Sequence, residues 1–240
     1  MKKLFLALLS LTMIAAHAQD EKIINDKNAQ KRSVSAFHAI KVSSGIDLYL
    51  TQSNTESVAV SASDKDYVER IVTVVENGVL KIYYDSENKL WSWNWGSRRL
   101  RAYVSVKNID GLSASGGSDV VVNGMIKTGK LTLDISGGSD FKGKIDADDL
   151  LVDQSGGSDI DISGKSVNLK IGCSGGSDFK GYDMMADNCM IDASGGSDVS
   201  VTVTKTLSAE ASGGSDISYK GGAMLKEKKT SGGGSVAKRN

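Results

Sequence analysis

The pentapeptide Ser-Gly-Gly-Ser-Asp occurs six times between residues 115 and 216, and no other feature of the sequence restricts the possible folds as strongly. Its copies begin at Ser115, Ser136, Ser155, Ser174, Ser194 and Ser212, at intervals of 21, 19, 19, 20 and 18 residues. Such a period is typical of a solenoid, in which each repeat forms one coil and neighbouring coils bury a common core. The repeat therefore predicts a stack of similar coils.

A second regularity lies one, three and five residues before each copy, where the side chains are almost all apolar. A spacing of two puts such residues on one face of a strand. The triplets are Leu131, Leu133, Ile135; Leu150, Val152, Gln154; Leu169, Ile171, Cys173; Cys189, Ile191, Ala193; and Leu207, Ala209, Ala211, and Leu112 and Ala114 precede the first copy. The residue after each aspartate is also apolar: Val120, Phe141, Ile160, Phe179, Val199 and Ile217.

These inward positions predict an all-β fold, a right-handed parallel β-helix or solenoid with coils of about 19 residues. Right-handed winding is expected because parallel crossover connections are almost always right-handed. A β-sandwich ranks second, because it would need hairpins instead of a long repeated return. Where the next triplet is due, Lys226, Lys228 and Thr230 occur, and charged residues there are expected to close the stack against edge pairing.

Residues 1–18 have the pattern of a secretory signal peptide. Lys2 and Lys3 form a basic start, an apolar run follows, and Ala16-His17-Ala18 forms a cleavage site. We therefore expect an exported chain, periplasmic or at the cell surface or extracellular, that begins at Gln19. No later apolar stretch is long enough to predict a membrane span.

The remaining chain divides into four parts by composition and pattern. Residues 19–32 are polar and charged, which predicts a flexible N-terminal segment. Residues 33–111 alternate apolar and polar side chains irregularly, with a turn expected at 64–66 followed by a strand, and they predict an irregular β part of the solenoid. Residues 112–236 form the regular repeat, and 237–240 a tail.

The repeated aspartates are expected to form a column along one edge of the solenoid. In the structural interpretation, Gly-Gly supplies the turn conformation, and the Ser and Asp side chains accept hydrogen bonds from turn amides. Stacked carboxylates could instead bind calcium, or act as an acid and a base in polysaccharide hydrolysis. The three interpretations stay open for Asp119, Asp140, Asp159, Asp178, Asp198 and Asp216.

A tryptophan-rich segment followed by arginines is the most distinctive unrepeated stretch. Tryptophan and arginine are enriched at binding hot spots, so this stretch is a candidate platform for a sugar or a partner protein. The alternative is that the tryptophans cover an apolar flank or one end of the solenoid. The residues are Trp91, Trp93, Trp95, Arg98, Arg99 and Arg101.

Other chemistry finds little support in the sequence. Lys plus Arg equals Asp plus Glu, at 29 each, so nothing suggests binding to nucleic acid. His38 is the only histidine after the signal peptide, so a histidine metal site is not expected. Cys173 and Cys189 are offset by four positions in adjacent coils, roughly 13 Å along a strand, so we expect two free, inward-facing thiols.

Three stretches resemble a known family. They are FHAIKVSSGIDLYLTQ at residues 37–52, GVLKIYY at 78–84, and the recurring Ser-Gly-Gly-Ser-Asp turns that follow VKNIDGLSASGGSDV. Together they resemble the secreted domain described as a putative autotransporter adhesin, head GIN domain. The resemblance implies a β-helix, an exported or envelope location in Bacteroidetes-like bacteria and an adhesive role. Gly45-Ile46-Asp47 stands where the family's name suggests Gly-Ile-Asn.

The sequence thus favours a non-enzymatic, exported β-solenoid that serves as a binding or envelope-structural module. Its partner is unknown, with a cell-surface glycan or an envelope protein as the candidates, and no cofactor is expected. A carbohydrate-active, pectinase-like enzyme is the first alternative, because relatives have been described as pectinase-like from their fold. A calcium-binding solenoid is the second alternative.

Overall fold

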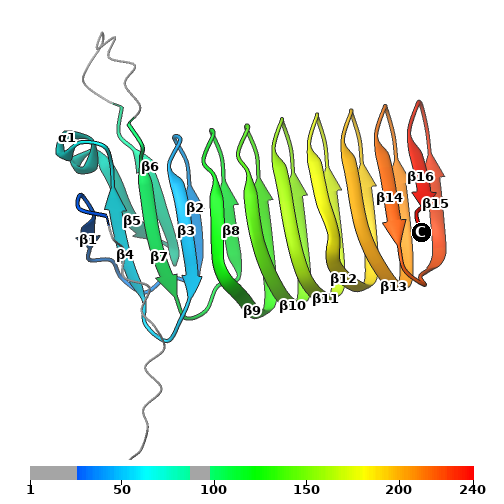
Figure 1. The fold of residues 1–240 in the computed structure, drawn as a ribbon, viewed down its shortest axis with the longest axis horizontal. Helices are drawn as coiled ribbons and strands as arrows, with labels where there is room; N and C mark the ends of the chain where they lie inside the picture. Colours follow the sequence, from blue (N-terminus) through cyan, green and yellow to red (C-terminus); the bar gives the residue numbers. More distant parts are fainter. Residues whose placement is uncertain (1–25, 87–97) are drawn as a thin grey trace, which may run out of the picture.

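The computed structural model describes residues 26–86 and 98–240, and it confirms the predicted β-solenoid (Figure 1). In this part of the chain, strands of one 16-stranded hydrogen-bonded network form about seven turns, and the only helix is short. The coils follow one another along the long axis, from the blue N-terminal end to the red C-terminal end.

Five long strands form the regular coils. They are β9 (Val120–Ile135), β10 (Phe141–Gln154), β11 (Asp159–Cys173), β12 (Asp178–Ala193) and β13 (Asp198–Ala211). Each strand bends in its middle, so its first half contributes to one face of the solenoid and its second half to the other. Neighbours pair in parallel and in the register of the repeat, with Leu150 between Leu131 and Leu169.

Two short strands continue each face toward the N-terminus. On the first face, β3 (Asp47–Gln52) pairs with β9, and β7 (Arg101–Val106) pairs with β3, both in parallel. On the second face, β8 (Gly111–Ala114) pairs with β9 and β2 (Ala39–Val42) with β8. The irregular region is therefore part of the same solenoid.

Antiparallel strands and a helix close the N-terminal end. On the first face β4 (Ser57–Ser61) pairs with β7, and on the second face β6 (Val79–Tyr84) continues from β2 and pairs with β5 (Ile71–Glu76). The helix α1 (Lys65–Glu69) lies between them and buries Val68. The end of the core is thereby covered.

Two expectations about this end were wrong. A turn was expected at residues 64–66, but α1 forms because the Asp64 side chain accepts a hydrogen bond from the Asp66 amide and caps the helix. The strand predicted after it is confirmed as β5. Residues 30–32 were assigned to a flexible segment, yet they form β1 (Gln30–Arg32), which pairs with β4. Arg32 also donates a 2.8 Å hydrogen bond to the Val68 carbonyl.

The predicted inward ladder is confirmed as the core. Every residue of the triplets and every residue after a repeat aspartate is buried. The one polar member, Gln154, donates hydrogen bonds of 2.6 Å to the Ser158 carbonyl and 2.9 Å to the Asp178 carbonyl. Its burial is therefore compensated, as a buried amide requires.

The prediction for the C-terminal end is confirmed only in part, because a register shift puts Leu225, and not Lys226, opposite Leu207. Here β14 (Asp216–Lys220) and β16 (Ser235–Lys238) extend the first face, and β15 (Met224–Thr230) extends the second. All side chains of β15 are exposed. Lys228 stands opposite Ala209 in the register, and its Nζ donates a 2.9 Å hydrogen bond to the Val236 carbonyl.

Candidate functional site

The second serine of every repeat is fully buried, and its hydroxyl forms hydrogen bonds within its own turn or to the preceding coil. In the last regular copy, the Ser215 hydroxyl donates hydrogen bonds to the Ala193 carbonyl (2.9 Å) and the Ser212 carbonyl (2.8 Å). The Ser212 amide in turn donates to the Ser215 oxygen at 3.1 Å. The buried serines are Ser118, Ser139, Ser158, Ser177, Ser197 and Ser215.

The first glycine of every repeat has a positive φ. At Gly175, φ is 80°, and an added Cβ would lie 2.8 Å from the Gly156 carbonyl oxygen. The second glycine differs between copies: Gly117 and Gly138 also have a φ of 72°, whereas Gly176 has an ordinary φ and open space around it. The prediction that Gly-Gly supplies the turn conformation therefore holds for the first glycine of every copy and for the second glycine of the first two.

The repeat aspartates lie side by side at the turns, and the carboxylates of the first two accept hydrogen bonds from the next coil. Asp119 accepts a 3.2 Å hydrogen bond from the Asp140 amide, and Asp140 accepts one of 3.1 Å from the Asp159 amide. Burial, followed by the neighbouring carboxylates of Asp178 and Asp216, raises the pKa of Asp198. These hydrogen bonds favour the structural interpretation. In the described ranges, no group of three or more His, Cys, Asp or Glu side chains is placed to hold a metal ion.

A further copy of the turn precedes the six that the sequence displays. The register places Val42 beside Ala114 and Leu48 beside Val120, so the Gly45-Ile46-Asp47 segment stacks on the first regular turn. Burial and the carboxylate of Asp119 raise the pKa of Asp47. The departure from Gly-Ile-Asn therefore falls in a turn, where Asp47 extends the aspartate column.

The tryptophan and arginine candidates can be placed only in part. Trp91, Trp93 and Trp95 lie outside the described residues. The Arg98 guanidinium lies over the Tyr84 ring, 5.1 Å from its centroid, and 6.0 Å from that of Tyr67. Arg98 thus packs against the N-terminal end of the solenoid.

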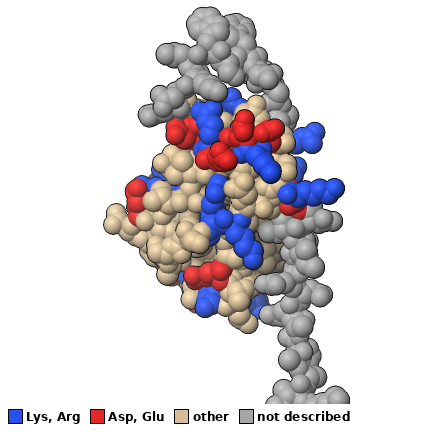
Figure 2. All heavy atoms as spheres, turned by 90° about the vertical axis from the view of Figure 1, so that its left-hand side faces the viewer, with Lys and Arg blue, Asp and Glu red and all other residues tan. Residues whose placement is uncertain are grey.

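Arg99 and Arg101 do not join Arg98 in one cluster of contacts. Arg99 is exposed, with a φ of 45°. Arg101 contacts the Asp26 carboxylate at 3.5 Å, and Ser61 and Tyr103 donate hydrogen bonds to the same oxygen. The bond from Ser61 is the main cause that lowers the pKa of Asp26. Figure 2 shows basic and acidic side chains interspersed over this end of the molecule.

The remaining sequence candidates are structural. Cys173 and Cys189 are free and buried, as predicted, and burial raises the pKa of the Cys173 thiol to about 12. His38 Nδ1 lies 2.7 Å from the Asp110 carboxylate in an exposed pair.

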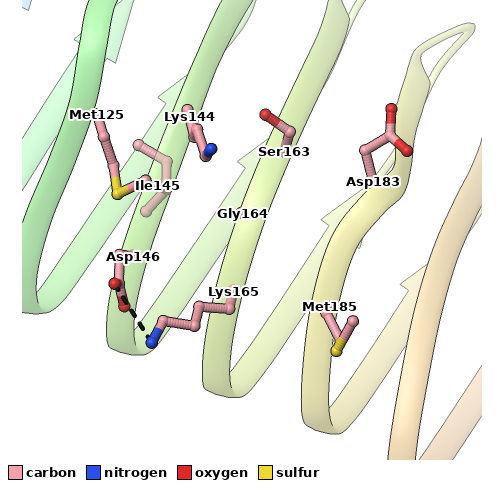
Figure 3. A pocket seen from close by; sticks show the side chains of 9 residues that line it. All are labelled: Met125, Lys144, Ile145, Asp146, Ser163, Gly164, Lys165, Asp183 and Met185. Atoms are coloured by element: carbon pink, nitrogen blue, oxygen red, sulfur yellow. Dashed lines mark ion pairs between the residues drawn. The ribbon is translucent and has the colours of Figure 1, made fainter.

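A groove on the first face, next to the bend, was not predicted (Figure 3). It has a volume of about 540 Å³ and crosses β9, β10, β11 and β12. Figure 3 shows side chains from all four strands around it. It is lined by Met125, Lys144, Ile145, Asp146, Ser163, Gly164, Lys165, Asp183 and Met185.

The groove follows from the unequal lengths of the coils. Between paired positions, β9 has three residues where β10 has one, and β12 has three where β13 has none. The core has no room for all of the extra residues, so part of each insertion bulges outward. Gly124, Tyr182 and Asp183 are exposed, whereas Val122 and Met184 are buried. The two 19-residue coils between these bulges form the floor. In the sequence, the groove is indicated by the unequal intervals between copies of the repeat, which are 21, 19, 19 and 20 residues long.

The floor of the groove is partly backbone. Ile145 lies beneath it with no exposed side-chain area. Gly164 has a φ of 119°, and an added Cβ would lie 1.9 Å from the Ile145 carbonyl oxygen, so no other residue fits there. Lys165 and Asp146 form an ion pair at 3.5 Å along one side (Figure 3).

Fold and surface together define a β-solenoid. Its inward positions are apolar in almost every coil, and its outward-facing residues differ from coil to coil. The chain belongs to the family described as "Putative auto-transporter adhesin, head GIN domain", whose model matches residues 36–223. This membership fits an exported or surface protein. A comparison with curated proteins finds no match, and no helix in the described ranges is long and apolar enough to cross a membrane.

Solved structures share the fold. A putative adhesin from Bacteroides fragilis has a TM-score of 0.76 at 19% identity, covering 88% of this chain and 95% of its own. A putative adhesin from Parabacteroides distasonis has a TM-score of 0.71 at 20% identity, covering 90% and 98%. A putative lipid binding protein from the same species has a TM-score of 0.66 at 21% identity, with the same coverage.

Proposed function

We propose that this protein is an exported, non-enzymatic β-solenoid that binds a component of a cell surface or envelope. The observation that carries the proposal is the groove across β9 to β12, a surface that exists only when four coils stack. The repeat supports the proposal because different residues serve the fold and the outer surface. Its serines and aspartates make hydrogen bonds within and between turns, which leaves the outward-facing residues free to differ from coil to coil.

Family membership supports the adhesive role and the exported location. The candidate partners are a cell-surface glycan and an envelope protein. A secondary contact is proposed at Trp91, Trp93 and Trp95 with the exposed Arg99, because tryptophan and arginine side chains give the largest binding energies at interfaces.

The proposal is tested by measuring binding of the purified, fluorescently labelled protein to intact Bacteroidetes cells by flow cytometry. We expect binding that saturates and that unlabelled protein displaces. A parallel assay follows reducing-sugar release from acidic polysaccharides, with a pectin lyase and a polygalacturonase as positive controls. Sugar release by the purified protein, or the absence of saturable cell binding, would contradict the proposal.

A glycan array distinguishes the two candidate partner classes. Wild type and Trp93→Ala are compared, with Tyr83→Ala as a control for loss of an exposed aromatic side chain. Glycans bound by wild type and Tyr83→Ala but not by Trp93→Ala would assign the tryptophan segment to sugar binding. Equal negative profiles would remove the glycan from the proposal and leave the envelope protein.

The calcium alternative has its own measurement. A resident calcium ion stabilises the folded state in proportion to its binding free energy, so its removal lowers the melting temperature. We expect the melting temperature to be the same in EDTA and in millimolar calcium. A higher melting temperature in calcium would assign the aspartate column to metal binding.

A further inference from the structure

We propose that the groove across β9 to β12 binds an extended polypeptide segment that presents an acidic, an apolar and a basic side chain on one side. This inference rests on the proposed binding function and names the chemical class of its partner. Three features of the groove carry it, namely an apolar hollow, two opposite charges on either side of the hollow, and the spacing between those charges.

The hollow is suited to an apolar side chain. Met125 on β9 and Met185 on β12 stand at opposite sides, and Ile145 lies beneath (Figure 3). Gly164 contributes no side chain, so the middle of the groove stays open. Methionine is flexible and polarisable and adapts to different apolar partners. Met185 is 55% exposed, so its side chain is accessible to a partner in the groove.

Two opposite charges lie across the hollow. Lys144 is on β10 and Asp183 is on β12, two coils away. Lys144 pairs with Ser163 in the register, and Gly164 pairs with Met184. Lys144, Ser163 and Asp183 thus follow one another along the solenoid axis. Among the described residues, no ion pair includes Lys144 or Asp183, whereas the neighbouring Lys165 is paired with Asp146.

The spacing fits a polypeptide in extended conformation. Two coil steps separate the charged positions by about 10 Å. In an extended peptide, residues i, i+2 and i+4 point to the same side and span about 13 Å. An acidic and a basic side chain at i and i+4 therefore reach Lys144 and Asp183 by leaning inward, and the side chain at i+2 enters the hollow. A neutral glycan offers no charge to either residue.

The probe is a set of short peptides titrated into isotope-labelled full-length protein and followed by amide NMR spectra. The complementary peptide is acetyl-Asp-Gly-Leu-Gly-Lys-amide. Three comparison peptides replace Leu by Ser, Lys by Asp, or Asp by Lys. We expect the complementary peptide to cause saturable shifts at the amides of Ser163, Gly164 and Met185, and to bind at least about 5-fold more tightly than each comparison peptide.

Matched variants separate the groove from the rest of the surface. Met185→Ala should weaken the complementary peptide about 3- to 10-fold, because it removes one wall of the hollow. Met190→Ala is the control, since Met190 lies on the same strand and is 54% exposed. Lys144→Glu should reverse the preference, so that the peptide with two lysines binds best. Lys170→Glu, an equal change of charge at an exposed lysine on the second face, should not.

Each outcome supports or overturns the inference. Peptide shifts in the groove that Met185→Ala weakens and Lys144→Glu redirects would support it. No peptide shifts, or shifts that these variants leave unchanged, would overturn it, while saturable cell binding by the wild type would still uphold the proposed function. In a last titration, vesicles of phosphatidylethanolamine and phosphatidylglycerol replace the peptides. Groove shifts with vesicles and none with peptides would assign the groove to lipid and overturn the polypeptide.

Discussion

The backbone amide of Ile46 donates a 3.0 Å hydrogen bond to the hydroxyl oxygen of Ser118. Ile46 occupies the place in its own coil that Ser118 occupies in the next. The repeat's serine position thus joins coils even where one of them lacks the serine. At the other end of the solenoid, Ser235 occupies the position of the repeat aspartate and donates a hydrogen bond to Asp216. The first and last turns in the stack are therefore incomplete copies of the Ser-Gly-Gly-Ser-Asp repeat.

The buried serine of each turn should contribute measurably to stability. Ser215→Ala leaves the Ala193 and Ser212 carbonyls without their hydroxyl donor, so we expect it to lower the free energy of unfolding by about 1 to 3 kcal/mol. Ser212→Ala is the matched control, because the Ser212 hydroxyl is partly exposed and reaches the Ala193 carbonyl only at 3.5 Å; it should cost less than about 0.5 kcal/mol. Chemical denaturation measures both. Equal effects would contradict the role of the second serine.

The two glycines of one turn should respond differently to alanine. Gly175→Ala forces a side chain into a left-handed conformation and against the Gly156 carbonyl, so we expect a loss of about 2 to 4 kcal/mol. Gly176→Ala meets open space at an ordinary φ and should change the free energy of unfolding by less than about 1 kcal/mol. Thermal melts of the two variants decide the point, and a reversed order would reject the turn geometry.

Asp198 should make the protein more stable in mild acid. Its pKa is raised by burial and by the carboxylates of Asp178 and Asp216, so the folded state takes up a proton before the unfolded state does. Stability therefore rises as the pH falls through the raised folded-state pKa, and the gain is complete below the unfolded pKa. We expect Asp198→Asn to raise the melting temperature at neutral pH by no more than about 2 °C. The difference from wild type should vanish in acid.

Asp192→Asn removes a charge from an exposed site on the second face of the solenoid and is the control for Asp198→Asn. A pH-independent difference between Asp198→Asn and wild type would show that proton uptake at Asp198 is not its source.

Arg98 should contribute more than Arg99 to the free energy of unfolding. Arg98 packs over Tyr84, so Arg98→Ala should lower the free energy of unfolding by about 1 kcal/mol. Arg99 is exposed, and Arg99→Ala should leave stability within about 0.5 kcal/mol of wild type. Denaturation curves test both statements. If Arg99→Ala is the more destabilising change, the assignment of Arg98 to the N-terminal end is wrong.

The sequence was sufficient to predict the core, because the inward positions are repeated. Leu131, Leu150 and Leu169 occupy the same place in successive coils, and only one register puts all such residues inside. The same register correctly predicted that Cys173 and Cys189 are free. Periodicity therefore determined the strands, their parallel pairing and the buried face.

The unrepeated parts were harder to predict, because local and tertiary effects compete there. The helix α1 depends on the cap at Asp64 and on burial of Val68, and the β-branched residues that follow it favoured a strand. The strand β1 has no apolar pattern and depends on its pairing with β4 and on contacts of Arg32. Polar sequence alone gives no sign of such pairing.

The candidate site was missed for a different reason. The groove depends on two coils that are longer than their neighbours, and no lining residue forms a recognised motif. The regular spacing of the repeat predicts the stacked coils, whereas the groove arises from the deviations in that spacing. The tryptophan segment, which attracted the functional hypothesis, lies outside the described residues.

The central claim is that the repeated acids build the turns and that the protein binds without catalysis. One variant replaces Asp119, Asp140, Asp159, Asp178, Asp198 and Asp216 by asparagine, which keeps the hydrogen-bond acceptor and removes the charge. Its cell binding is measured by flow cytometry beside that of wild type, after circular dichroism has shown that both are folded. We predict equal, saturable binding and no reducing-sugar release by either protein. A folded variant that has lost binding, or sugar release that only the wild type shows, would contradict the account.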